Sequence, residues 1–158
     1  MKPSIEQLSE KKLIGLYVTM SLAKNKTGDL WKNFMQRRKE ITNNLSNDLI
    51  SLQVYNSIYF QDFKPTTTFE KWATTEVSDF NAVPKGMDAF VLESGLYAVF
   101  NYKGSSTNTD IYQYIFGVWL KNSEYLLDDR PHFEVLGKNY KNADPSSEEE
   151  IWIPIKKK

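Results

Sequence analysis

The chain has 158 residues, and its 20 basic side chains balance its 20 acidic ones. This balance argues against a nucleic-acid-binding protein, which would need an excess of positive charge to hold phosphates. The sequence has no cysteine and one histidine, His132, which excludes disulfides, thiolate metal sites and histidine pairs. We therefore expect neither a metal nor another cofactor.

The apolar segment Leu13–Ala23 follows two lysines and ends in Ser21-Leu22-Ala23, which resembles the cleavage site of an export signal. However, Glu6 and Glu10 lie in the region that would have to be basic, and the segment is too short to span a bilayer. We interpret it as a strand of a cytoplasmic protein that does not enter the membrane, with export as the alternative.

The first half of the chain predicts a strand at about 12–23 and a helix at about 29–43 with Thr27 as its cap. Strands follow at about 49–56 and 68–77, separated by Ser, Asn, Asp and Pro. The apolar stripe of the helix consists of Leu30, Trp31, Phe34, Met35 and Ile41.

The second half predicts the same order of elements. A strand at about 89–102, broken near Ser94-Gly95, precedes a helix at about 110–121 that is capped by Asn108 or Thr109. Strands at about 132–137 and 149–155 complete this half. Gly15-Leu16-Tyr17 recurs as Gly95-Leu96-Tyr97, so the chain has a weak internal repeat of the type β-α-β-β.

Alternation along the strands predicts which side chains meet the helices. Ile14, Leu16, Val18, Met20 and Leu22 form one apolar set that we assign to the helix side. The same reasoning assigns to the helix side Leu52, Val54, Leu96, Ala98, Phe100, Phe133, Val135, Ile151, Ile153 and Ile155.

Glu134 is then turned away from the helices, although it lies in an otherwise apolar strand. A carboxylate in such a place is costly to desolvate unless it has a partner. The aromatic residues predicted on the same side are Tyr17, Tyr55, Trp72, Tyr97 and Trp152. They suggest a cleft that accepts a flat, apolar, cationic molecule by stacking and cation–π contact, with Glu134 as its charge partner.

Several segments of the second half resemble the GyrI-like family, the effector-binding domain of bacterial transcription activators of the AraC type. They are Val83-Pro84-Lys85-Gly86-Met87, Gly95–Phe100, Tyr102-Lys103-Gly104, Trp119-Leu120, Tyr125, Arg130–Glu134 and Glu150–Ile155. The resemblance is good over about 83–155. Over 12–77 it rests on the order of the predicted elements.

The resemblance implies an α+β fold in a single domain over 1–158, with halves at about 12–77 and 83–155. Two β-α-β-β modules would be related by a pseudo-two-fold axis, with two helices on one face of an antiparallel sheet and a concave ligand cleft on the other. In the family a glutamate after the second helix meets hydrophobic cations, and Glu134 falls on that motif. An aromatic residue often follows two places later, where this chain has Leu136.

Three functions remain open from the sequence. The first is a stand-alone multidrug-binding protein for small hydrophobic or cationic compounds, linked to transcription regulation or to sequestration, with Trp119 and His132 as further candidate ligand-binding residues. The second is a hydrolase of small electrophilic compounds that uses Glu134 as general acid or base. The third is a module that binds a protein partner, such as a DNA gyrase inhibitor, through Asp128-Asp129 or Ser146–Glu150.

Overall fold

A computed structural model describes residues 1–158 and shows an antiparallel sheet with two helical segments. The first helical segment is α1 (Thr27–Arg37) with a 3₁₀ turn, η1 (Arg38–Glu40). The second is continuous through α2 (Asp110–Tyr114), the π-helical η2 (Ile115–Trp119) and α3 (Leu120–Asn122). The strands are β1 (Ser4–Leu8), β2 (Lys11–Met20), β3 (Leu49–Val54), β4 (Phe69–Val77), β5 (Asp88–Leu92), β6 (Gly95–Lys103), β7 (Tyr125–Leu127), β8 (His132–Leu136) and β9 (Glu148–Lys157).

This arrangement confirms the predicted α+β fold. Each half contains the order strand, helix, strand, strand, and the break near Ser94-Gly95 separates β5 from β6. Two short strands were not predicted. Four of the five residues of β1 are exposed, so the strand has little apolar alternation, and β7 has only three residues.

The helix ends differ from the prediction in detail. Thr27 does not cap α1: it lies inside the helix, and its backbone N–H donates to Asn25 Oδ1 at 2.9 Å. At α2, Asn108 Oδ1 accepts from the backbone N–H of Asp110 at 2.9 Å, as expected for a residue at a helix start. Leu22 was assigned to the core but lies beyond the end of β2 and is 51% exposed.

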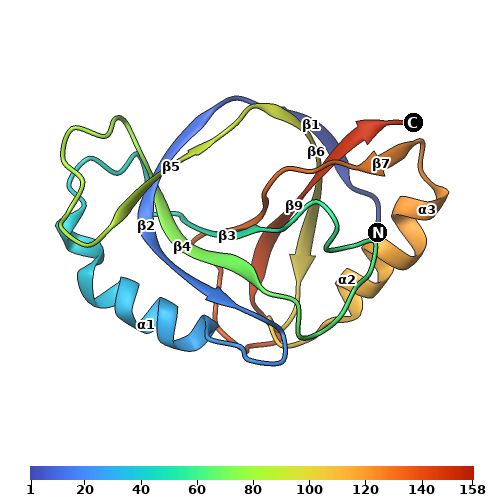
Figure 1. The fold of residues 1–158 in the computed structure, drawn as a ribbon, viewed down its shortest axis with the longest axis horizontal. Helices are drawn as coiled ribbons and strands as arrows, with labels where there is room; N and C mark the ends of the chain where they lie inside the picture. Colours follow the sequence, from blue (N-terminus) through green and yellow to red (C-terminus); the bar gives the residue numbers. More distant parts are fainter.

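The sheet curls back on itself. Its strand order is β1-β6-β9-β8-β3-β4-β2-β5, and β7 pairs with β9. β1 runs into β2 and β5 runs into β6, so the two edges of the sheet belong to continuous stretches of chain. Figure 1 shows the strands arranged around a ring, with α1 on one side of it and α2–α3 on the other.

The two faces of this sheet are both apolar, and both helical segments pack on the same one. We call this the outer face. Ile14 and Ala73 pack against Leu30 and Phe34 of α1. The side chains that pack with α2 and η2 are Ala98, Phe100, Ile151, Ile153 and Ile155.

The opposite, inner face has a core of its own. Its buried members are Leu8, Leu13, Ile50, Leu52, Trp72, Leu92, Tyr97, Val99 and Phe133. The sequence assigned Leu52, Val54, Phe133 and Val135 to the helix side, and this was wrong. Alternation shows that these residues share a face, but it cannot show which face when both are apolar.

Candidate functional site

Glu134 lies on the outer face, not on the face opposite the helices as predicted. It pairs with Ser51 of β3 on one side and with Ile151 of β9 on the other, and Ile151 packs beneath α2. Because residues paired across a sheet project to the same face, Glu134 lies on the helix side, between the two helical segments. The predicted grouping of Glu134 with an aromatic set is therefore wrong for Tyr17, Trp72, Tyr97 and Trp152, which are on the inner face.

A buried charge pair lies at the centre of the outer face. Glu134 Oε1 accepts a hydrogen bond from Gln53 Nε2 at 3.0 Å and lies 3.8 Å from Lys71 Nζ. The side chains of Lys71 and Glu134 are 10% and 12% exposed. Burial raises the pKa of Glu134 above its usual value, which the charge of Lys71 and the Gln53 bond partly oppose. Burial likewise lowers the pKa of Lys71, although Glu134 favours its charged form.

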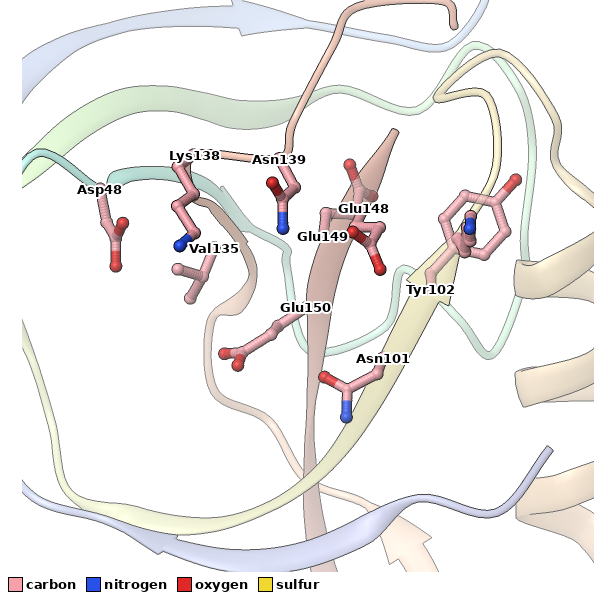
Figure 2. Close-up of a pocket in the computed structure, with 11 residues that line it drawn as sticks. Asp48, Asn101, Tyr102, Val135, Lys138, Asn139, Glu148, Glu149 and Glu150 are labelled. Atoms are coloured by element: carbon pink, nitrogen blue, oxygen red, sulfur yellow. The ribbon is translucent and has the colours of Figure 1, made fainter. Parts of the chain in front are cut away.

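A second carboxyl group, Glu149 at the start of β9, acts on the same pair. Burial and then the negative charge of Glu134 together raise the pKa of Glu149 to about 7, against the opposing charge of Lys71. Glu149 lines a pocket of ≈460 Å³, and Figure 2 shows it together with Glu148 between Asn139 and Tyr102. Glu134, Glu149 and Lys71 therefore form a group of two carboxyls and one ammonium whose charges act on one another.

A cluster of flat rings lies on the same face as the charge pair. Phe60 belongs to the segment between β3 and β4, and its ring stacks on His132 at 5.2 Å and on Phe116 of η2 at 5.3 Å. Tyr55 meets His132 edge-on at 4.9 Å. His132 and Tyr55, both predicted as site residues, thus lie on the face of Glu134. The negative charge of Glu134 adds to burial in raising the pKa of Tyr55.

Tyr112 reaches the same region from α2. Burial raises its pKa strongly, and the charge of Glu134 is the next largest cause. Neither the hydroxyl of Tyr55 nor that of Tyr112 makes a hydrogen bond to another protein group. Two phenols are therefore available to a bound molecule beside the buried carboxylate.

The sequence missed Lys71, Gln53, Tyr112 and Glu149 as members of this site. Lys71 and Gln53 become neighbours of Glu134 only through the register of β3, β4 and β8, for which the sequence has no local signal. Glu149 had a signal: it precedes Ile151 by two residues and must share its face. The sequence instead suggested the acidic run around it as a segment that binds a protein partner.

The remaining predicted residues have packing roles on other parts of the molecule. Trp119 packs edge-on against Phe100 at 5.3 Å and stacks on Tyr125, away from Glu134. Tyr97 is fully buried, and its hydroxyl donates to the carbonyl oxygen of Pro131 at 2.8 Å. Tyr17 stacks on Trp72 at 4.6 Å.

The comparisons with known proteins agree on the family and the fold. The family model of the GyrI-like small molecule binding domain matches residues 1–156. Compared with curated protein sequences, the chain matches none. None of its helices has the length and apolarity that a bilayer crossing requires.

Three solved structures share the fold at low sequence identity. The structure of SAV2435 bound to tetraphenylphosphonium is 18% identical with a TM-score of 0.72, over 99% of this chain and 94% of that one. The integron cassette protein VCH_CASS2 of Vibrio cholerae is 17% identical with a TM-score of 0.67, over 98% and 96% of the two chains. The C-terminal domain of EcmrR is 14% identical with a TM-score of 0.72, over 99% and 98%.

Proposed function

Because the chain belongs to the GyrI-like family of small-molecule-binding domains, we propose that its outer face binds hydrophobic organic cations, with Glu134 as their charge partner. The observation that carries this proposal is the buried carboxylate beside flat rings. Glu134 is 12% exposed, and the rings of Tyr55, Phe60 and His132 lie on its face. A cation held there gains both the charge of Glu134 and the faces of the rings.

The charge balance of the site supports a cationic rather than an anionic ligand. Lys71 alone opposes Glu134 and Glu149, so the site is one positive charge short when both carboxyl groups are ionised. The ammonium of Lys71 lies 3.8 Å from Glu134 Oε1, which is long for an ion pair, so it satisfies the carboxylate only in part. An incoming cation would supply the missing charge.

We expect the segment between β3 and β4 to move when a ligand binds beside Glu134. Tyr59 in this segment is buried against Met20 and Phe69, while the ring of Phe60 contacts both His132 and Phe116. We expect an aromatic ligand to take the place of the Phe60 ring, because it offers the same stacking surface. SAV2435, which shares the fold, has been solved with the hydrophobic cation tetraphenylphosphonium.

In this proposal the protein is a cytoplasmic receptor that senses or sequesters such compounds, and nucleic acid is not its direct ligand. The formal net charge of zero is consistent with that view.

Replacing Glu134 by glutamine should weaken the binding of tetraphenylphosphonium by about tenfold or more, because the ligand's charge would lose a desolvated partner. The measurement is quenching of tryptophan fluorescence in a titration of wild type and variant. Neutral triphenylphosphine oxide should bind both proteins with similar affinity.

Glu124→Gln is the matched control, since Glu124 is exposed and undergoes the same change of charge. It should leave both affinities unchanged. A wild type that binds neither compound, or a Glu134→Gln variant that keeps full affinity for the cation, would contradict the proposal.

A further inference from the structure

The inner face has a pocket of its own, on the side of the sheet opposite Glu134. It has a volume of ≈400 Å³ and is lined by residues of β1, β2, β3, β4, β8 and β9. Phe133 and Trp152 stack at 5.1 Å with an angle of 18° between their planes and form part of its floor. The other apolar residues that line it are Leu8, Ile50 and Val135.

Four carboxyl groups line this pocket, and they are Glu6, Asp48, Glu76 and Glu150. The only basic residue among the lining side chains is Lys11, whose ammonium already pairs with Glu76 at 3.3 Å. Three carboxylates of the pocket are therefore left without a cationic partner.

Glu150 is held in a fixed place beside the aromatic floor. Its Oε1 accepts a hydrogen bond from the indole Nε1–H of Trp152 at 3.0 Å. Figure 2 shows Glu150 extending toward Val135, away from Glu148 and Glu149. Phe133 is 1% exposed and packs on the half-buried ring of Trp152, so Trp152 is the ring that can face a ligand. The carboxylate beside it offers a charge and the indole offers a flat apolar surface to one molecule at the same time.

We propose that the inner pocket is a second binding site, separate from the outer face, and that it takes a small organic ammonium ion with a flat apolar body. The excess of carboxylates disfavours an anion. An inorganic metal ion is disfavoured because no three carboxyl or imidazole groups converge closely enough to hold one. The aromatic ring in the floor favours an organic ammonium ion, because it can attract the charge by cation–π contact and pack against the apolar body.

The inner pocket shares Asp48, Val135 and Glu150 with the pocket that Glu149 lines, but neither Glu134 nor Glu149 lines the inner pocket, so the two sites can be tested apart. Glu134 and Val135 are neighbours in β8 but project to opposite faces, and only Val135 lines the inner pocket. A change at Glu134 removes charge from the outer face, and a change at Glu150 removes charge from the inner pocket. Failure of the proposed function at Glu134 would therefore leave the inner-pocket test intact.

The test is a titration of the ¹⁵N-labelled protein with benzyltrimethylammonium, followed by the indole N–H signals of the four tryptophans. The Trp152 signal is assigned by its loss in Trp152→Phe. We expect this signal to shift saturably in the wild type. In Glu150→Gln the affinity should fall by about fivefold, because one rim charge is lost while the glutamine oxygen still accepts the indole hydrogen bond.

Glu134→Gln and the control Glu124→Gln should leave the shift of the Trp152 signal unchanged. If Glu150→Gln does not fold, Glu6→Gln replaces it, because Glu6 is an exposed member of the rim and should weaken binding by about twofold. No saturable shift of the Trp152 signal in the wild type, or an affinity that neither rim variant lowers, would overturn the proposal.

Discussion

Replacing Gly15 by alanine should destabilise the protein by about 3 kcal/mol or more, because β2 has no room for a side chain at this position. Gly15 lies in the middle of β2 and pairs with Thr74 of β4 and with Asp88 of β5. A β-carbon here would overlap the carbonyl oxygen of Ala73 and lie 2.8 Å from Cα of Thr74. Both are backbone atoms of a paired strand, so relief requires a shift of the sheet itself.

Two other glycines provide matched comparisons for this variant. A β-carbon at Gly117 would meet nothing within 4 Å, so Gly117→Ala should be neutral or stabilise by up to about 1 kcal/mol. At Gly95, the equivalent position in the repeat, the β-carbon would overlap the guanidinium of Arg130, which is a side chain and can move. The loss of unfolding free energy in Gly95→Ala should therefore lie between those of Gly15→Ala and Gly117→Ala.

Urea unfolding followed by circular dichroism measures all three variants. Equal unfolding free energies for Gly15→Ala and Gly117→Ala would show that the close approach of β2 and β4 is not as tight as the structure indicates.

The repeat that the sequence shows in Gly-Leu-Tyr also extends further than that tripeptide. Glu70 and Trp72 in β4 stand at the same spacing as Glu150 and Trp152 in β9. In both pairs the indole N–H donates to the glutamate two residues earlier, at 3.1 Å and 3.0 Å. The same local contact in the same strand of each half supports the predicted duplication.

The order of elements could be predicted because helix and strand periodicities are local signals. That Glu134 would have a partner could be predicted for a similar reason, since a single carboxylate in an apolar strand is costly to bury alone. Its face could not. β2, β6 and β9 have large apolar side chains on the outer face, whereas Phe133 and Val135 of β8 are apolar on the inner face.

The partner of Glu134 could not be predicted either. Lys71 is far from Glu134 in the sequence and reaches it through two strand pairings, β4 with β3 and β3 with β8. Those registers are fixed by packing on both faces of the finished sheet. The contact of Phe60 with His132 also depends on the conformation of the segment between β3 and β4, which strand alternation does not predict.

Acid should unfold the wild-type protein more readily than a His132→Phe variant. His132 is 5% exposed, and burial lowers its pKa to about 3, whereas the ordinary pKa of histidine is about 6.5. Above pH 6.5 the imidazole is neutral in both the folded and the unfolded chain, so it contributes no pH dependence. As the pH falls from 6.5 toward 3, the unfolded chain takes up a proton that the folded protein excludes, and stability is lost.

The expected size of this effect is large for one side chain. Between pH 7 and pH 4.5 the wild type should lose about 2 to 3 kcal/mol more unfolding free energy than His132→Phe. Glu134 and Glu149, whose pKa values are raised, take up protons in the folded state and act in the opposite direction. Their contribution is common to both proteins and cancels in the comparison.

Phenylalanine suits this comparison because it keeps a flat ring between Tyr55 and Phe60, where His132 meets the two rings at 4.9 Å and 5.2 Å. Urea unfolding at the two pH values supplies the four free energies. Equal losses in the wild type and in His132→Phe would mean that the imidazole takes up its proton in the folded state. The ring cluster of Tyr55, Phe60 and His132 would then admit water, contrary to the buried arrangement on which the proposed cation site depends.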